Sequence, residues 1–265
     1  MLKNYLKIAL RNLLRYKAYT FINIVGLAVG MACCTLMLLF IRHELSYDRF
    51  HKNAENIYRM TMHNSREGKV HAGSVMAAPI GPALAEDYPE ILQAVRLQTP
   101  YNSTPVKYQD RQFYEEKLYY ADPNIFKVFD FPFQQGEAAT ALQNPQSVVL
   151  SQDAARKYFG EENPLGKILQ IERGELEFQV TGVLQAIPPT SSERPDFLIP
   201  FSNLGARRLG NWWMFSYLTY VLLDEKASAA QVAAKLPEFV RNCVADRKLS
   251  ISQSGAGESS GGAEV

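Results

Sequence analysis

The chain has 265 residues, of which 47% are hydrophobic and 21% are charged, and its formal net charge is +1. This size and composition allow one large core or two modest ones, and the near-neutral charge gives no global argument for nucleic-acid binding. The charge is nevertheless uneven. Residues 1–42 hold six Lys/Arg and no Asp/Glu, which leaves 22 basic and 27 acidic residues for the remainder. A basic N-terminal segment followed by an acidic remainder is typical of a membrane segment that sets the orientation of its chain.

Residues 1–17 are predicted to form a cytoplasmic, amphipathic and basic helix. One face of that helix carries leucines, at Leu2, Leu6, Leu10 and Leu13. A helix of this kind lies in the headgroup plane, with its basic side chains toward anionic lipid. A topogenic signal without a lipid partner is the alternative. The predicted membrane-interface basic face consists of Lys3, Lys7, Arg11, Arg15 and Lys17.

Residues 18–41 are predicted to form a transmembrane helix, because no charged residue stands between Lys17 and Arg42. At about 1.5 Å per residue the segment would span roughly 36 Å, enough for a hydrocarbon core of about 30 Å. A buried core helix would carry a polar face, and the apolar part of a signal peptide would be shorter. The preceding basic residues place the N-terminus in the cytoplasm and residues 42 onward outside it.

Within this span, Gly26 and Gly30 form a G-x-x-x-G pattern, and Cys33 and Met37 continue roughly the same side. Small residues at this spacing allow another helix to approach closely, so we expect a helix-packing face here. Glycine is frequent in membrane helices in any case, which keeps the alternative of no specific contact open. The only cysteine outside the span is Cys243, so we expect no intramolecular disulfide in the extracytoplasmic part.

Residues 42–247 are predicted to form one extracytoplasmic domain of mixed α and β structure. Strand-like composition and turn residues predict hairpins around residues 109–110 and 173–175. Strands and helices are interspersed without regular alternation, which favours the α+β class over a doubly wound sheet. Further strands are expected at residues 56–62, 94–100 and 216–223, and a short helix at 79–88.

The clearest local signal is "SVVLSQDAARKYFG". A β-rich run leads to Ser151 as the N-cap of a helix, Asp153 lies in its first turn, and Gly160 stands where it should end. Another helix is expected from Ser228, with Pro237 bending or breaking it. Residues 248–265 are rich in Gly and Ser and are predicted to be a disordered tail.

Motifs for chemistry are missing from the sequence, and we predict no catalytic, cofactor-binding or metal-binding residue. "GEENPLGK" has five residues between its glycines instead of four and lacks a hydroxyl residue after its lysine, so it is not a phosphate loop. "HELSY" places Tyr47 where a zinc protease needs its second histidine. Four scattered histidines are expected on solvated surface: His43, His51, His63 and His71. Six aromatic residues are interpreted as core or a protein-binding face: Tyr119, Tyr120, Phe126, Phe129, Phe131 and Phe133.

Several stretches together resemble MacB-type (FtsX-like) ABC-transporter permeases. These are "LKIALRNLLRYKAYTFINIVGLAVGMACC", "HELSYDRFHKNAENIYRM", "LYYADPNIFKVFDFPFQQGEAATALQNPQSVVLSQDAARKYFGEENPLGKILQI" and "FQVTGVLQAIPP". The resemblance covers about residues 1–242. It implies one transmembrane helix and a periplasmic core domain, in a non-catalytic subunit of the inner membrane that exports or extracts a substrate.

The resemblance also implies partners. A separate cytoplasmic ABC ATPase subunit would bind the ATP, and its motion would be relayed through the membrane to the periplasmic domain. The working unit would contain a second permease copy, as a homodimer or with a related permease. A periplasmic adaptor and the lipid bilayer complete the expected partners, and no nucleic acid is among them.

After Asn242 the resemblance ends, and a Gly/Ser-rich stretch stands where the family continues toward three further transmembrane helices. We therefore expect that this chain is truncated before those helices. The alternative function is a single-pass, membrane-anchored binding or sensing domain outside the cytoplasm. The transported substrate is not specified by any polar cluster in the sequence.

Overall fold

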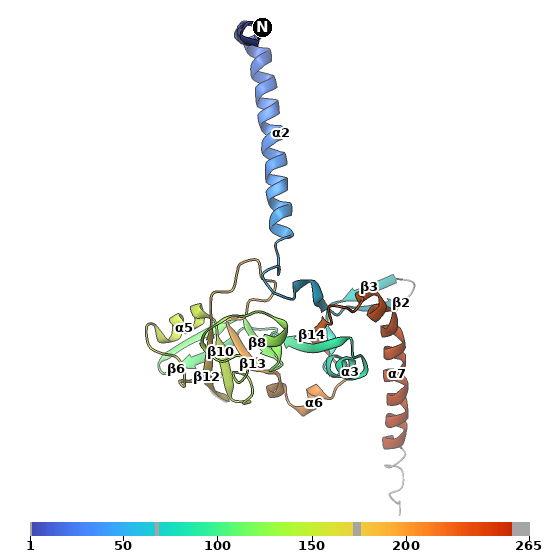
Figure 1. Cartoon of the computed structure of the whole chain (residues 1–265). Coiled ribbons are helices and arrows are strands. Elements are labelled where there is room, and N and C mark those ends of the chain that lie inside the picture. The colour runs from blue at the N-terminus through green and yellow to red at the C-terminus, as the bar shows by residue number, and fades with distance from the viewer. Residues whose placement is uncertain (1, 67–68, 172–175, 256–265) are drawn as a thin grey trace, which may run out of the picture. The chain divides into compact units, whose positions relative to one another are not determined.

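The structure is a computed structural model that describes residues 2–66, 69–171 and 176–255 (Figure 1). It divides into two units. The first comprises residues 1–50 and 188–193, and the second comprises residues 51–187 and 194–265. Both a mixed α/β sheet domain and an N-terminal apolar helix are present, which confirms the predicted fold class.

The first unit consists of two helices, the short segment 45–50 that follows them, and residues 188–193. Helix α1 spans Leu2–Arg15, and helix α2 spans Lys17–Glu44, so α2 contains the whole predicted transmembrane segment. After α2, Asp48 joins residues 45–50 to residues 188–193. Its backbone N–H donates to the carbonyl oxygen of Thr190 at 2.9 Å, and its Oδ1 accepts from the backbone N–H of Ser192 at 2.8 Å.

The second unit is built on one large sheet. Among the described residues this sheet has twelve strands, and most neighbouring pairs are antiparallel. Two pairs are parallel, β10 with β12 and β8 with β13. The path through the sheet is β1 (Ile57–Arg59), β14 (Phe215–Leu223), β5 (Ile91–Gln98), β8 (Leu118–Ala121), β13 (Phe197–Pro200), β10 (Ser147–Leu150), β12 (Leu176–Leu184), β11 (Ile168–Ile171), β6 (Thr104–Tyr108) and β7 (Arg111–Glu115), with β4 (Met76–Ala77) beside β14 and β9 (Phe133–Gly136) beside β12.

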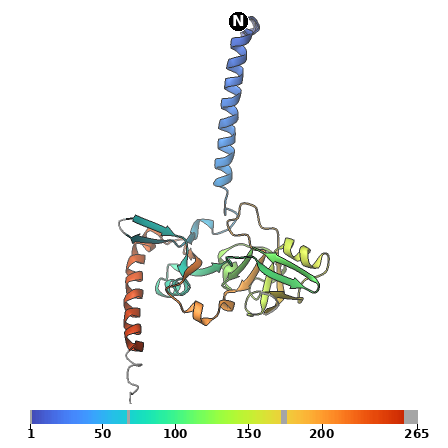
Figure 2. The same ribbon diagram turned by 180° about the vertical axis from the view of Figure 1, so that it is seen from behind.

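Short helices and one small hairpin complete the second unit. Strands β2 (Met62–Arg66) and β3 (Lys69–Gly73) pair only with each other among the described strands. Within this unit, α5 packs near β10 and β12, whereas α3 packs on β5 and β14, as Figures 1 and 2 show from opposite sides. The helices are η1 (Ala54–Asn56), α3 (Ile80–Asp87), α4 (Ile125–Val128), α5 (Gln152–Phe159), η2 (Phe201–Leu204), α6 (Ala206–Leu209) and α7 (Ala229–Gly255).

Short sequence patterns predicted several of these elements correctly. The Oγ of Ser151 accepts from the backbone N–H of Ala154 at 3.1 Å, so Ser151 is the N-cap of α5, and the helix ends at Gly160 with a φ of 64°. Strands β6 and β7 form the predicted hairpin, in which Tyr108 pairs with Arg111 and Gln109 takes a φ of 52°. Strands β11 and β12 form the second hairpin, whose predicted turn at residues 173–175 lies outside the described residues.

Helix α7 passes through Pro237 without ending, which excludes a break there, and a bend at this proline stays a prediction. The helix also includes residues 248–255, which were predicted to belong to a disordered tail. A proline removes one helical hydrogen bond, but extending a helix that has already formed gains one bond for each residue added. The alanines around Pro237 favour such an extension. Residues 256–265 of the predicted tail lie outside the described residues.

The prediction that His51 lies on solvated surface is wrong. Its exposed fraction is 4%, its ring packs edge-on against Phe129 and Phe131, and its Nδ1 accepts from the backbone N–H of Asp130 at 2.9 Å. Partners almost eighty residues away in the sequence cannot be read from local pattern. Of the other histidines, His43 is exposed, and the side chains of His63 and His71 lie outside the described set.

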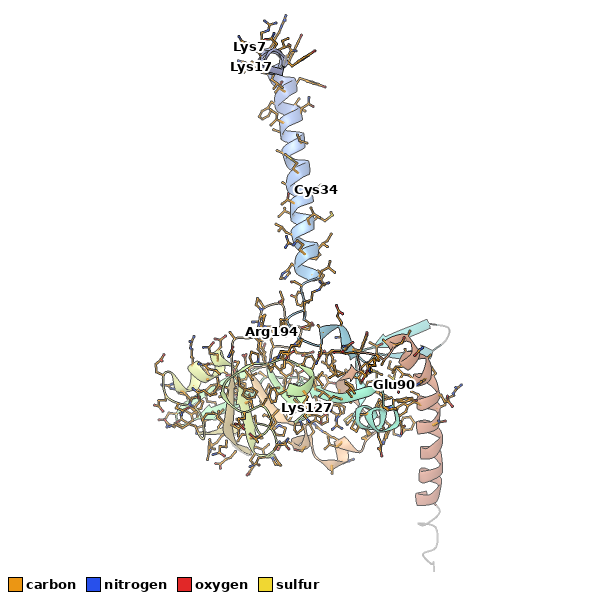
Figure 3. The ribbon with its side chains drawn as sticks, viewed as in Figure 1. Lys7, Lys17, Cys34, Glu90, Lys127 and Arg194 are labelled. Carbon is orange, nitrogen blue, oxygen red and sulfur yellow. The ribbon has the colours of Figure 1, made fainter. Side chains whose placement is uncertain are left out.

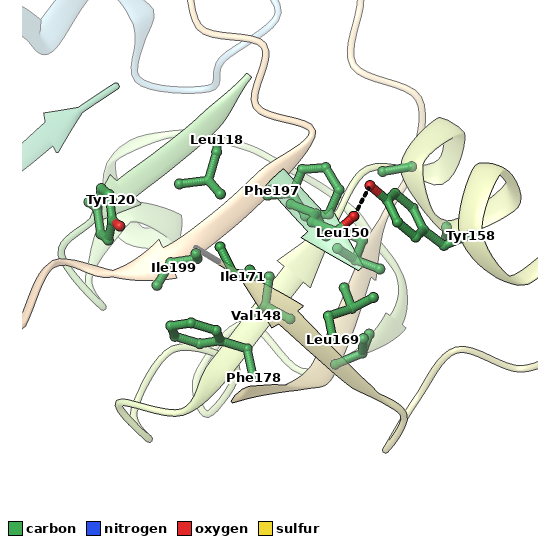
Figure 4. Close-up of a cluster of buried hydrophobic side chains, with 14 of the residues drawn as sticks. Leu118, Tyr120, Val148, Leu150, Tyr158, Leu169, Ile171, Phe178, Phe197 and Ile199 are labelled. Carbon is green, nitrogen blue, oxygen red and sulfur yellow. Dashed lines mark hydrogen bonds between the residues drawn. The ribbon is translucent and has the colours of Figure 1, made fainter. Parts of the chain in front are cut away.

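The core covers both faces of the central sheet. In β10, Val148 and Leu150 belong to one buried cluster and Val149 to another, and β13 divides Phe197 and Leu198 in the same way. Figure 4 shows the first of these clusters. The strand period of two therefore gives each central strand two buried faces. A third cluster, around Leu84, joins α3, β5, β14 and α7. The six predicted aromatic residues belong to the core. Phe129 and Phe131 are buried in the second cluster, with Tyr119, Phe126 and Phe133 partly buried against it, and Tyr120 is buried in the first cluster.

Gly136, at the end of β9, offers a test of this packing. A Cβ there would stand 2.4 Å from the backbone oxygen of Thr181, and its φ of +86° is unfavourable for any other residue. Gly160 is a matched control, since its φ is +64° but a Cβ would meet nothing within 4 Å. Gly136→Ala should lower the free energy of unfolding by about 1–3 kcal/mol more than Gly160→Ala, as overpacking does. Urea denaturation measures both, and equal losses would contradict the close approach of β9 to β12.

Candidate functional site

Helix α2 is the first candidate functional element, because nearly all of its side chains are exposed and none is buried. Phe21, Leu27 and Phe40 keep between 65% and 68% of their surface exposed. Among the described helices, α2 alone is long and apolar enough to cross a membrane. A helix that is apolar on every side and uncovered by its own chain requires an apolar surrounding.

The predicted basic face lies at the N-terminal end of this unit. Lys7, Arg11 and Arg15 lie on α1 and Lys17 begins α2, and all four side chains are exposed. Figure 3 labels Lys7 and Lys17. Lys3 lies on α1, but its side chain is outside the described set, as are those of Leu2, Leu6 and Leu10. The role of this basic face at a lipid surface remains a prediction.

The ends of α1 and α2 are joined by a side-chain hydrogen bond, in which the Oγ1 of Thr20 donates to the carbonyl oxygen of Leu13 at 3.1 Å. The hydroxyl of Thr35 donates to the Met31 carbonyl at 2.8 Å. Both threonine hydroxyls are therefore satisfied inside the first unit. Internal satisfaction of polar groups is what a lipid environment demands.

The predicted helix-packing face lies in the middle of α2. A Cβ at Gly26 or Gly30 would meet nothing within 4 Å, so the surface over these glycines is open. Cys33 and Cys34 are free thiols and Met37 is exposed. The open surface leaves room for a second helix, but helix packing at this face remains a prediction.

In the second unit, Arg96 and Asp122 form the best-organised ion pair. The Nε and Nη2 atoms of Arg96 donate to the two carboxylate oxygens at 2.8 and 2.7 Å, and the backbone N–H of Arg96 adds a third bond. The Nη1 atom donates to the carbonyl of Ala78, and the guanidinium lies 4.4 Å from the centre of the Phe201 ring. One arginine thus fixes β5, β8, η2 and the segment before α3. Every polar group of this pair is used within the fold, so we assign it a structural role.

Glu115 is a buried carboxylate with two internal partners. It accepts from the Tyr158 hydroxyl at 2.6 Å and from the Lys157 Nζ at 2.7 Å. Burial of Tyr158, and then its contact with Glu115, raise the pKa of the phenol well above its ordinary value. Glu115 therefore holds α5 against β7. Because its carboxylate is engaged by Lys157 and Tyr158, we assign it a structural role.

A second carboxylate pair joins α7 to the rest of the unit. Lys235 on α7 donates to Glu90, which stands just before β5, and this contact lowers the pKa of the glutamate. Among the residues that the structure describes, no group of three or more His, Cys, Asp or Glu could hold a metal ion.

The second unit also contains an open groove of about 890 Å³. Its walls come from the β5–β6 connection with the start of β6, from η2 and α6, and from the start of β14. Polar and apolar atoms contribute about equally, and Arg208 is the only lining residue with a formal charge. The lining residues are Gln98, Pro100, Tyr101, Asn102, Ser103, Thr104, Pro105, Tyr120, Asn203, Leu204, Arg208, Met214 and Ser216.

This groove was missed in the sequence. Residues 98–105 and residues 203–216 are separated by about a hundred positions, and each stretch alone has only the composition of a turn or loop. Their proximity depends on the order of the strands, since β5 pairs with β14 on one side and with β8 on the other. No short motif encodes that arrangement.

The structure thus has an α+β sheet domain that follows a candidate membrane helix. The family described as the MacB-like periplasmic core domain matches residues 20–239, and the chain belongs to this family. No curated protein matches the sequence.

Two crystal structures show the same fold. One is a domain described as part of a permease protein from Porphyromonas gingivalis, with a TM-score of 0.65, 23% identity and coverage of 72% of this chain and 83% of that one. The other is the periplasmic region of MacB from Actinobacillus actinomycetemcomitans, with a TM-score of 0.55, 18% identity and coverage of 76% and 88%. The chain thus combines a MacB-like periplasmic core domain with a candidate membrane helix at its N-terminal end.

The Arg96–Asp122 pair generates a stability prediction. The two side chains are only 14% and 13% exposed, so Asp122→Asn should leave Arg96 without its counter-charge and lower the free energy of unfolding by about 2–4 kcal/mol. The control is Glu162→Gln, whose ion pair with Lys167 is 66% and 41% exposed and should contribute less than about 1 kcal/mol. Chemical denaturation measures the free energy of unfolding of both variants. A similarly small loss of this free energy in each would refute the structural role of Arg96.

Proposed function

We propose that this chain is part of the permease subunit of an ABC transporter and relays the motion of a separate ATPase to the periplasmic domain. The observation that carries this proposal is the family match over residues 20–239, which includes most of α2 and nearly all of the described sheet domain. The relay would serve export or extraction of a substrate. We assign no catalytic step to this chain, and ATP would be bound by the ATPase.

The proposed setting is the inner membrane, with α1 on the cytoplasmic side and the sheet domain in the periplasm. Five basic residues precede the apolar part of α2, and the positive-inside rule keeps such a flank in the cytoplasm. The proposed partners are a cytoplasmic ABC ATPase, a second permease copy, the bilayer and a periplasmic adaptor.

The relay is tested with the permease that contains this chain, co-purified with the ABC ATPase encoded beside it. We expect the two to remain together in detergent and the permease to change the rate of ATP hydrolysis. An ATPase variant without its phosphate-loop lysine controls for contaminating hydrolysis. If the ATPase neither binds nor responds, the relay is refuted and the anchored sensing domain becomes the better account.

The orientation is tested by reversing the basic flank, with Lys7, Arg11, Arg15 and Lys17 all changed to glutamate. A single cysteine at the exposed position 127, in a chain whose own three cysteines are replaced by alanine, reports the side of the membrane. Because the positive flank sets topology, a membrane-impermeant maleimide should label Lys127→Cys in intact cells, and the reversed flank should abolish this labelling.

The matched control for this orientation test carries the same number of charge reversals far from α2 in the sequence, at the exposed residues Lys107, Lys117, Arg156 and Lys226. Charges this distant from a membrane span contribute little to topology, so labelling should persist. Labelling that survives reversal of the flank itself would contradict the proposed orientation.

A further inference from the structure

The groove of the second unit presents one unpaired positive charge. Arg208 is exposed, and among the described residues its side chain makes neither an ion pair nor a hydrogen bond. Among the described residues that line the groove, none is acidic. A guanidinium in this position favours a carboxylate, which it can bind with two parallel hydrogen bonds.

Three side-chain amides line the same groove, at Gln98, Asn102 and Asn203, and each carries an oxygen that can accept hydrogen bonds. The Nδ2 of Asn203 donates to the carbonyl oxygens of Pro145 and Pro200, at 2.8 and 3.0 Å. Both amide hydrogens of Asn203 are thereby used, and its Oδ1 remains an acceptor. The Oε1 of Gln98 is buried and has no hydrogen-bond partner among the described residues. A ligand that enters here with N–H donors would supply the bond that Gln98 lacks.

Apolar surface lies next to these polar groups. Tyr101, at the edge of the groove, is 88% exposed, and Pro100, Leu204 and Met214 add apolar lining. Exposed aromatic rings beside prolines are suited to an extended chain, since they cover an apolar side chain and leave its backbone free for hydrogen bonds.

We propose that this groove binds an extended polypeptide segment that carries an Asp or Glu side chain. Arg208 takes the carboxylate, Gln98 and Asn203 accept from backbone N–H groups, and Tyr101 covers an apolar side chain. A lipid chain would need a mainly apolar lining, and an inorganic anion would need several converging cations. The groove has neither, whereas a peptide supplies all three kinds of contact.

This inference goes beyond the proposed function, because binding in the groove requires no ATPase. A failure of ATPase coupling would leave it intact, and a failure of peptide binding would leave the relay intact. The two tests therefore have separate outcomes.

The test uses the full chain in a non-ionic detergent and follows its intrinsic fluorescence. The chain has two tryptophans, Trp212 and Trp213, and they directly precede the lining residue Met214. The probe is a blocked pentapeptide that contains one glutamate and one leucine, and its counterpart has glutamine in place of the glutamate. We expect saturable binding of the glutamate peptide, about tenfold tighter than that of the glutamine peptide.

Two pairs of variants locate the site. Arg208→Glu should weaken binding of the glutamate peptide about tenfold, whereas Arg207→Glu on the same helix, outside the groove lining, should not. Tyr101→Ala should weaken binding of both peptides, whereas Tyr114→Ala, 68% exposed on β7, should not. Each variant must keep the thermal midpoint of the parent chain, and because all four positions are exposed we expect that it does.

The proposal is overturned if neither peptide produces a saturable change at millimolar concentration. It is also overturned if both peptides bind equally, or if Arg207→Glu is as damaging as Arg208→Glu, since the effect is then one of overall charge. Binding of dodecyl maltoside or of a fatty acid in place of the peptide, seen as competition at the same site, would assign the groove to a lipid instead.

Discussion

The organisation of this protein depends on one helix that its own chain does not cover. Residues 18–41 contain eleven Leu, Ile, Phe or Val residues, and none of the side chains of α2 is buried. At about 0.3–0.6 kcal/mol for each such residue at the centre of a bilayer, insertion gains roughly 3–7 kcal/mol. In water the same surface would drive aggregation. The helix is therefore stable only where lipid or another apolar helix surrounds it, and that requirement fixes the setting in which the sheet domain works.

The sheet domain meets the opposite requirement, because it must remain folded in water on its own contacts. The central strands β10 and β13 are buried on both faces by two hydrophobic clusters, and a third cluster joins α3, β5, β14 and α7. The buried carboxylates of Asp122 and Glu115 are paired within the domain, with Arg96 and Lys157. A rigid body of this kind can transmit displacement, since close-packed interiors deform little.

The parts predictable from the sequence are those encoded by neighbouring residues. The apolar span, the Ser151 cap, the Gly160 stop and the β6–β7 hairpin each follow from spacing of a few positions. Parallel pairing of β8 with β13, the burial of His51 and the groove were not predictable, because each joins residues about eighty or more positions apart. The entropic cost of such contacts depends on the length of the chain between the partners, so a short stretch of sequence does not reveal them. The helical state of residues 248–255 was missed for another reason. Their Gly/Ser-rich context predicted a coil, but adding residues to the helix that precedes them gains one hydrogen bond each.

The two candidate functional elements differ in what determines them. The anchor is set by composition alone, so many sequences of similar hydrophobicity would serve, and its glycines and basic flank only tune packing and orientation. The groove depends on particular side chains in three separate segments, held by the Asn203 bonds to Pro145 and Pro200 and by the Arg96–Phe201 contact beside them. Because rigid elements position loops that are free to vary, recognition is more easily changed than anchoring. Within one fold, the permease framework can therefore stay constant while the groove is adapted to a different polypeptide.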